Sequence, residues 1–195
     1  LNYDPQNPTW VGRDRFYLDP GHMAPMLYSQ LALIGKYSLE ELAQLRQWGS
    51  PTTGHPEFEV ERGVENTSGP LGQGHTFAVG AAIAAKFLAA KTGNPTFAKE
   101  TIYAYISDGG VQEEISQGAA RVAAVLGLDN LIMFYDSNDI QLSTETAEVM
   151  TEDTAAKYRA LGWEVIEING NDVVEIRKAI ETAKAVVGKP TLIIG

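Results

Sequence analysis

The sequence predicts an α/β fold of three layers (α/β/α), in which helices cover both faces of a mostly parallel sheet. Two continuous apolar runs, at residues 102–106 and 131–135, are typical of buried strands, and the alanine-rich stretch between them is long enough for a helix. Two further strand-like segments, at residues 163–168 and 191–194, are separated by a helical pattern. Because strands that alternate with helices form parallel sheets, we expect one α/β domain.

The first part of the chain predicts a loop followed by two helices. Residues 1–20 are rich in Pro, Asn and Asp, which is typical of a surface loop. Residues 24–34 form an apolar helical pattern. A second helix is expected to begin at Ser38, where Glu41 completes a capping box, and to run to about Trp48.

The middle and the end of the chain complete the expected elements. Residues 49–74 carry several Gly and Pro and predict a long loop, which in a compact domain is functional or disordered. The small-residue segment 73–90 predicts a helix that is buried by close packing. A polar loop at 143–150, a helix at 151–161 and an amphipathic helix at 173–187 follow the central strands.

The composition is that of an ordinary globular chain, with 195 residues of which 44% are hydrophobic and 21% charged. The formal net charge of −10 argues against nucleic acid and anionic membranes as general partners. The chain has no cysteine, so a disulfide framework, a zinc-finger pattern and a thiol nucleophile are excluded. With no apolar run near the ~18 residues of a membrane helix and no signal peptide, we expect a cytoplasmic protein.

Both ends of the sequence suggest an excerpt of a longer polypeptide. Residues 1–8 lack an initiator Met and resemble an internal loop, and the last strand-like segment stops just after it emerges from a helix. We therefore expect a single domain over residues 1–195 that is incomplete at both ends.

Two polar side chains follow the two central strands and predict a metal site. Asp108 ends the first strand and Asn138 ends the second, thirty positions later. The carboxyl ends of neighbouring parallel strands meet at one edge of the sheet, where open α/β sheets bind ligands. A carboxylate and an amide suit Mg²⁺ on a phosphate or diphosphate. The alternative is that each residue only caps or turns the chain.

Glycines and histidines give further candidates. The segment 69–74, GPLGQG, directly precedes the small-residue helix, where backbone N–H groups could meet an anion or a flat ring, although such a segment is more often structural. Three histidines follow glycine, but their spacing fits no zinc site. His22 and His55 are expected in loops that could face a ligand, whereas His75 is expected to be a satisfied structural histidine.

Two charged residues have both a structural and a functional interpretation. Arg46, near the end of its expected helix, is either a surface cation beside the helix dipole or a phosphate clamp. Glu113 follows the turn Ser107-Asp108-Gly109-Gly110, which we call the metal turn, and the helix dipole alone would explain an acidic residue there.

Taken together, these motifs resemble the thiamine diphosphate-binding domain of the transketolase family. They are Gly21-His22, Arg46 with Gly54-His55-Pro56, the segment 69–74, and Asp108-Gly109 with Asn138. The resemblance covers almost the whole chain in order, including the LNYDPQNPTW opening and the DTAAKYRALGW helix. It implies a thiamine diphosphate-binding fold.

The resemblance implies specific roles at the cofactor. The side chains of Asp108 and Asn138 and the carbonyl of Ile140 would hold Mg²⁺, or Ca²⁺ in its place, on the diphosphate, and Gly109 would contact the diphosphate through its backbone. The other residues expected to line the cofactor cleft are His22, Gly69, Pro70 and Leu71.

The resemblance also assigns roles at the substrate and at a partner. His55 would be the catalytic residue that faces the sugar hydroxyls, Arg46 would bind the terminal phosphate, and Glu113 would reach across a dimer interface. Two positions depart from the family pattern, since Ser107 replaces the first Gly of Gly-Asp-Gly and Ser137 replaces the first of the paired Asn. Both departures keep the expected ligand itself.

The implied activity is the ketol transfer of the pentose phosphate pathway, between sugar phosphates. It requires a pyrimidine-binding domain that this chain lacks, in the same or a separate chain, and hence a homodimer or heterotetramer. Alternatives are a related enzyme, such as 1-deoxyxylulose-5-phosphate synthase or dihydroxyacetone synthase, and a non-catalytic assembly subunit of the same fold.

Overall fold

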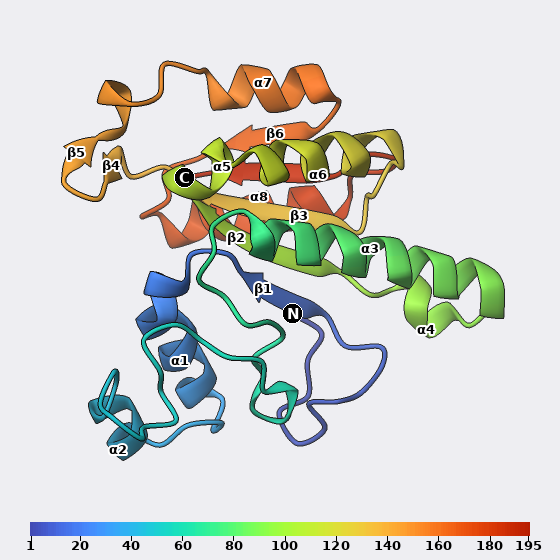
Figure 1. The fold of residues 1–195 in the computed structure, drawn as a ribbon. Helices are drawn as coiled ribbons and strands as arrows, with labels where there is room; N and C mark the ends of the chain where they lie inside the picture. Colours follow the sequence, from blue (N-terminus) through green and yellow to red (C-terminus); the bar gives the residue numbers. More distant parts are fainter.

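Five parallel strands form the central sheet of the computed structural model, which describes residues 1–195 (Figure 1). Their order across the sheet is β1-β2-β3-β7-β6, and every neighbouring pair is parallel. The strands are β1 Arg15–Leu18, β2 Ile102–Ser107, β3 Leu131–Asp136, β6 Glu164–Glu167 and β7 Thr191–Ile194. The expected parallel sheet is confirmed.

Helices and short turns make up most of the remainder. The helices are α1 Ala24–Leu33, α2 Leu39–Ala43, α3 Gln73–Thr92, α4 Pro95–Ala98, α5 Asp108–Gln112, α6 Glu114–Val125, α7 Thr154–Leu161 and α8 Val173–Lys184. The 3₁₀ turns are Gly21–Met23, Val60–Arg62 and Thr146–Glu148, and a small antiparallel hairpin joins β4 Ile140–Gln141 to β5 Thr144–Glu145. No helix combines the length and the apolar character that crossing a bilayer requires.

The helices lie in two layers, one on each face of the sheet (Figure 1). Helices α3, α6 and α7 bury side chains against one face of β2 and β3, in the largest hydrophobic cluster. On the other face, α8 packs against β3 and β7, and α1 packs near β1 through Leu27 and Leu31. The three-layer α/β/α arrangement predicted from the sequence is therefore confirmed.

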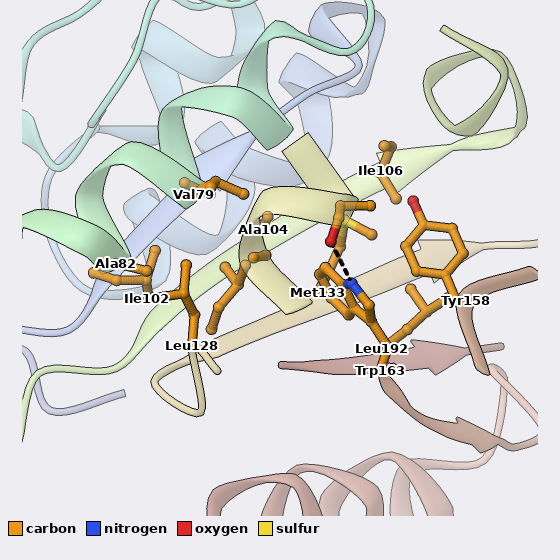
Figure 2. Close-up of a cluster of buried hydrophobic side chains, with 14 of the residues drawn as sticks. Val79, Ala82, Ile102, Ala104, Ile106, Leu128, Met133, Tyr158, Trp163 and Leu192 are labelled. Atoms are coloured by element: carbon orange, nitrogen blue, oxygen red, sulfur yellow. Dashed lines mark hydrogen bonds between the residues drawn. The ribbon is translucent and has the colours of Figure 1, made fainter. Parts of the chain in front are cut away.

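The largest cluster is closed by an aromatic pair (Figure 2). The indole N–H of Trp163 donates a hydrogen bond to the carbonyl of Ala120 at 2.9 Å, and the ring of Tyr158 meets the indole edge-to-face at 5.2 Å. Tyr158 belongs to α7, and Trp163 follows α7 and bonds to Ala120 in α6, so the pair holds α6 and α7 together over the central strands.

The structure corrects three boundaries. Strand β1 lies inside residues 1–20, which were expected to be a loop. Helix α2 has the predicted capping box at Ser38 but ends at Ala43 rather than near Trp48. It ends early because Arg46 takes a left-handed backbone conformation, with φ 64°, and donates its N–H to the carbonyl of Thr52. Helix α7 begins at Thr154 rather than residue 151, because Asp153 is its N-cap.

Helix α3 is buried on one face only, so the expectation of a buried helix is confirmed for that face and wrong for the opposite one. Ala78 and Ala82 are completely buried against the sheet. On the opposite face Phe77 is 45% exposed and Phe87 is 59% exposed, and Gly80 also lies at the surface. The small residues of α3 therefore pack against the sheet on one face, while the opposite face is apolar and exposed.

His75 is structural, as expected, but only partly satisfied. It is completely buried in α3, its Nδ1 lies 2.7 Å from the hydroxyl of Ser116, and its Nε2 has no hydrogen-bond partner. Burial lowers the pKa of His75 to about 4, which keeps the ring neutral at ordinary pH.

This neutral histidine predicts a loss of stability in acid. Below about pH 6.5, the ordinary pKa of histidine, the unfolded chain binds a proton that the folded chain does not, until the pH reaches the folded value of about 4. Within this window the free energy of unfolding should fall by about 1.4 kcal/mol per pH unit from His75 alone. Urea titrations at pH 5 and pH 7 should show a smaller pH effect for His75→Asn than for the unsubstituted protein. An equal effect in both would contradict a neutral His75.

Candidate active site

A cleft of about 780 Å³ opens at the carboxyl ends of β2 and β3. These two strands are paired in register from Ile102 opposite Leu131 to Ser107 opposite Asp136, so the turns that follow them lie together. The cleft is lined by His22, Met23, Leu71, Ser107, Asp108, Gly109, Asp136, Asn138, Ile140, Gln141 and Leu142. The structure thus brings Asp108 and Asn138 to one cleft, with four more of the expected site residues.

Asp108 lines this cleft, and one of its carboxylate oxygens has no hydrogen-bond partner. It is 2% exposed, its Oδ1 accepts a hydrogen bond from the hydroxyl of Tyr135 at 2.5 Å, and its Oδ2 is buried without a partner. Burial raises the pKa of Asp108 above the ordinary carboxyl value, and the charges of Asp136 and Asp139 add to this effect, while the hydroxyls of Tyr135 and Thr146 counteract it. An unpaired buried carboxylate oxygen is costly unless a ligand satisfies it.

Asn138 occupies a tight turn that continues into the β4–β5 hairpin. Its side-chain oxygen accepts the N–H of Ile140 at 3.0 Å, and its amide donates to Asp136 at 3.4 Å. The next residue, Asp139, has a left-handed backbone with φ 61°. An amide oxygen has two lone pairs, so Asn138 can accept this hydrogen bond and still face a ligand.

These groups fit a hard divalent cation. The free Oδ2 of Asp108 supplies a charged oxygen, and Asn138 and Ile140 supply neutral oxygens beside it in the same cleft. No set of three or more His, Asp or Glu side chains is arranged to hold a metal. A cation at this cleft would therefore need amide and carbonyl oxygens, together with the oxygens of a bound phosphate group.

The glycine segment lies against both the metal turn and His55. A Cβ atom at Gly109 would lie 2.7 Å from Leu71 Cδ1, so Gly109 allows the two segments to touch. A Cβ at Gly21 would lie 2.6 Å from His55 Cδ2 and 3.0 Å from the Cα of Gly69. Pieces of chain that are far apart in sequence therefore meet around the cleft.

The start of α3 is not available to an external anion. The carboxylate of Asp19, at the end of β1, already accepts hydrogen bonds from the N–H groups of Gly72 and His75. Of the two uses proposed for the glycine segment, the binding of an anion by these N–H groups is therefore wrong. The structural use is supported, and contact with a flat ring through Gly69–Leu71 stays a prediction.

Arg46 and His55 lie at the rim rather than inside the cleft. Both side chains are exposed. The guanidinium of Arg46 donates to the carbonyl of His22 at 3.3 Å, and a Cβ at Gly54 would lie 3.4 Å from Arg46 Cγ. Arg46 is thus placed next to both histidine turns, and no carboxylate pairs with it in a salt bridge.

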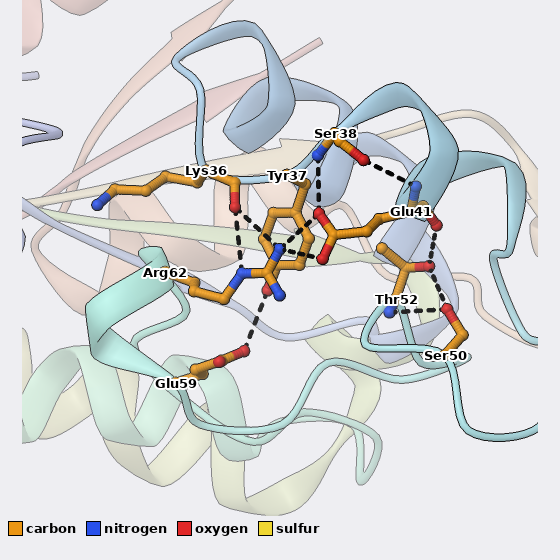
Figure 3. A network of polar contacts seen from close by, with 8 residues as sticks. All are labelled: Lys36, Tyr37, Ser38, Glu41, Ser50, Thr52, Glu59 and Arg62. Atoms are coloured by element: carbon orange, nitrogen blue, oxygen red, sulfur yellow. Dashed lines mark hydrogen bonds and ion pairs between the residues drawn. The ribbon is translucent and has the colours of Figure 1, made fainter.

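The loop that carries His55 is held to α2 by a polar network around Glu41 (Figure 3). Arg62 binds both carboxylate oxygens of Glu41 at 2.8 Å and lies 3.7 Å above the ring of Tyr37. The hydroxyl of Thr52 donates to the backbone carbonyl of Glu41 at 2.7 Å. Because α2 leads into Arg46 and Thr52 leads into His55, this network sets the separation of the two rim residues.

Glu113 lies between α5 and α6 and is exposed. It packs against the glycine segment, since a Cβ at Gly72 would lie 2.9 Å from Glu113 Cβ. Its carboxylate forms no salt bridge within the chain, so it is free to meet a group from outside.

Sequence reasoning missed two groups that support the cleft. The Tyr135 hydroxyl holds Asp108, although the sequence indicated only a buried strand residue there. Gln112 donates to Gln141 at 2.8 Å and to the carbonyl of Asp108 at 3.1 Å, which ties α5 to the β4–β5 hairpin. The paired glutamines are a weak sequence signal because Gln is common at surfaces.

Tyr135 should tune the affinity of the site for a cation. Burial, together with the neighbouring carboxylate, raises the pKa of Tyr135, so its hydroxyl stays protonated and donates to Asp108. We expect Tyr135→Phe to weaken Mg²⁺ binding about 10-fold, as loss of a group that orients a metal ligand does. The Mg²⁺ concentration needed for half-maximal cofactor binding would measure this. Tyr17→Phe is the control, because Tyr17 is also a largely buried strand tyrosine but does not contact Asp108. An equal change in both variants would contradict the role of Tyr135.

Comparisons with known proteins agree with this arrangement. Residues 1–195 match the family model described as transketolase, thiamine diphosphate binding domain. The transketolase of Geobacillus stearothermophilus is 45% identical over 99% of this chain, and that of Mycobacterium leprae is 46% identical over 99%. The chain spans only 30% and 29% of these two relatives.

Solved structures give the same result. A transketolase from Campylobacter jejuni superimposes with a TM-score of 0.93 at 44% identity, over 100% of this chain and 30% of its own. A Pichia stipitis transketolase in complex with sedoheptulose 7-phosphate gives a TM-score of 0.93 at 41% identity, over 99% of this chain and 29% of its own. The chain belongs to the transketolase family and corresponds to its thiamine diphosphate-binding domain.

Proposed function

We propose that this chain is the diphosphate-binding part of a transketolase, which transfers a two-carbon ketol group from a ketose phosphate to an aldose phosphate. The observation that carries the proposal is the cleft in which the unpaired Oδ2 of Asp108 lies with Asn138, His22 and Leu71. Membership of the family supports thiamine diphosphate as the cofactor. A relative solved with sedoheptulose 7-phosphate supports sugar phosphates as substrates.

In this proposal the residues of the cleft hold the cofactor. Asp108, Asn138 and the carbonyl of Ile140 bind Mg²⁺, or Ca²⁺ in its place, and the backbone of Gly109 contacts the diphosphate. When bound, thiamine diphosphate supplies the carbon nucleophile and the electron sink for two-carbon transfer. The walls of the cofactor cleft are His22, Gly69, Pro70 and Leu71.

The rim residues act on the sugar. His55 faces the sugar hydroxyls, and an imidazole can accept or donate a proton there near neutral pH. Arg46 binds the terminal phosphate, for which its planar guanidinium is suited. Both side chains are exposed beside the cleft, which supports their access to a substrate.

Activity in this proposal requires a second domain, the pyrimidine-binding domain, in the same or a separate chain and within a homodimer or heterotetramer. The exposed apolar face of α3, with Phe77 and Phe87, supports a partner on that side. Glu113, which packs against Gly72 just before α3, is exposed and free to reach a group of the partner. A cytoplasmic location remains a prediction.

A binding and a turnover measurement test the proposal. Calorimetry on the full-length protein, or on this chain with its separate partner, should show thiamine diphosphate binding that depends on Mg²⁺. The same sample should turn over pentose phosphates and not pyruvate with a triose phosphate. Turnover of pyruvate would favour the alternative that the protein is a 1-deoxyxylulose-5-phosphate synthase. Cofactor binding without any turnover would favour the alternative of a non-catalytic assembly subunit. Absence of cofactor binding would overturn the proposal.

A further inference from the structure

Asp19 is a completely buried carboxylate that no part of the proposed reaction uses. It follows β1 directly and is 0% exposed. It has no cationic partner among the salt bridges. A buried carboxylate without a cation is costly, so its surroundings have to compensate.

The compensation comes from the backbone at the start of α3. Asp19 Oδ2 accepts the N–H of Gly72 at 3.0 Å, and Oδ1 accepts the N–H of His75 at 3.3 Å. Burial raises the pKa of Asp19, and the N–H groups of Gly72, His75 and Gly74 each lower it, so all three act on the carboxylate. These donors are among the first N–H groups of a 20-residue helix, which have no partner within the helix and lie at its positive end.

The backbone around Asp19 is shaped to admit the carboxylate. A Cβ at Gly74 would lie 2.4 Å from the Cα of Asp19, so α3 approaches the end of β1 as closely as backbone allows. Gly72 has a left-handed backbone, with φ 83°, that starts the helix. A Cβ at Gly110 would lie 2.5 Å from Asp19 Oδ2, so the metal turn also touches this carboxylate.

Asp19 therefore touches or adjoins three segments of the cofactor cleft. Pro20-Gly21-His22 follows it in the chain, Gly72 binds it through its N–H, and Gly110 contacts it two residues after Asp108. These three segments contain His22, the glycine segment 69–74 and the proposed metal ligand Asp108.

We propose that Asp19 is a positioning residue that fixes the Gly69–Gly72 wall of the cleft against the His22 turn and the Asp108–Gly110 turn. This inference rests on the proposed function. The carboxylate acts on the wall that would face the ring of the cofactor, whereas Asp108 and Asn138 act on the diphosphate. Loss of Asp19 should therefore weaken binding of the whole cofactor more than binding of its diphosphate part.

Asp19→Asn tests this, because it keeps the shape of the side chain and removes the charge. In the full-length protein, or this chain with its partner, the Kd for thiamine diphosphate in saturating Mg²⁺ should rise about 10-fold, the loss expected for one charge-assisted hydrogen bond. The Kd for magnesium pyrophosphate, measured by the same calorimetry, should rise clearly less than that. An unchanged Kd for thiamine diphosphate, or an equal loss for both ligands, would overturn the proposal.

Asp172→Asn is the matched control. Asp172 also accepts two N–H groups at the start of a helix, from Val174 at 2.8 Å and Glu175 at 3.3 Å, but it is outside the cleft. It should alter stability without changing either Kd. If it reproduces the Asp19 effect, then general destabilisation explains the result and the inference is wrong.

Hydrogen exchange of the unliganded protein gives a second readout that needs no cofactor. Asp19→Asn should speed exchange of the amides at residues 72–75 and not of those in α8. Unchanged exchange at residues 72–75 would overturn the role of Asp19 in positioning the start of α3. An unsubstituted protein that binds no thiamine diphosphate would overturn the proposed function instead. If Asp19→Asn does not fold, Asp19→Ser, which keeps one short acceptor, has to show the same difference between the two ligands.

Discussion

Asp108→Asn is expected to abolish Mg²⁺-dependent binding of thiamine diphosphate. The substitution keeps the shape of the side chain but replaces the unpaired, buried Oδ2 and its charge with a neutral amide. Mutation of a group that hydrogen-bonds to a metal ligand lowers metal affinity about 10- to 100-fold, so loss of the charged ligand itself should lower the affinity at least about 100-fold. Calorimetry with and without Mg²⁺ measures the effect. A normal Kd in the variant, or an equal loss with and without Mg²⁺, would contradict the assignment of Asp108 to the metal.

The same substitution should leave the unliganded protein at least as stable. In the free protein, Asp108 Oδ2 is desolvated and unpaired, and burial raises the pKa of the group because the charged form is disfavoured. A neutral amide removes this cost and can still accept the hydrogen bond from Tyr135. The melting temperature of unliganded Asp108→Asn should therefore not fall, even though cofactor binding is lost.

Asp129→Asn is the control for Asp108. Asp129 lies before β3, at the opposite end from the cleft, and is paired with Lys86 at 2.6 Å. Its substitution should leave cofactor binding unchanged and should not raise the melting temperature. A cofactor effect in this variant would show that the loss in Asp108→Asn does not come from the cleft.

The central strands and the metal turn could be predicted because their signals are local. Residues 102–106 and 131–135 are continuous apolar runs that each end in polar turn residues, so the strands and the places of the turns that follow them could be predicted from neighbouring residues. The structure pairs Ser107 with Asp136, which puts Asp108 and Asn138 at the same edge.

Strand β1 could not be predicted, because its burial depends on distant partners. The Arg13-Asp14-Arg15 run reads as exposed loop, yet Arg13 pairs with Glu65 at 2.7 Å and Arg15 pairs with Glu100 at 2.5 Å. These carboxylates lie 52 and 85 positions away in sequence. Charges that neutralise one another only after folding carry no local signal of burial.

The supporting groups of the cleft were missed for a similar reason. The Tyr135 hydroxyl reaches Asp108 across two strands, 27 positions apart, and no periodicity shows which strand tyrosine does so. Asp19 is the clearest case, since it reads as a turn residue before Pro20. Its N–H partners at the start of α3 begin 53 positions later. Sequence patterns predicted the candidate ligands, whereas contacts between distant segments determine how these side chains are held.

Arg46→Ala is expected to weaken binding of phosphorylated sugars 10- to 100-fold, the loss of one or two charge-assisted hydrogen bonds. Steady-state kinetics of the complete enzyme should show a higher KM for sugar phosphates and little change for the corresponding unphosphorylated sugars. For sugar phosphates, the KM of Arg46→Lys should lie between the KM of the unsubstituted enzyme and that of Arg46→Ala, because lysine keeps the charge but lacks the planar guanidinium.

The lysine variant also separates charge from backbone strain. Arg46 has a left-handed backbone, φ 64°, and its guanidinium supports the carbonyl of His22, so any substitution disturbs the loop to some degree. Such disturbance acts on every sugar alike, and it is similar in the alanine and lysine variants. A phosphate clamp instead predicts a loss confined to phosphorylated sugars and smaller for lysine. Equal losses in both variants and for both classes of sugar would therefore assign Arg46 to holding the His22 turn rather than to binding phosphate.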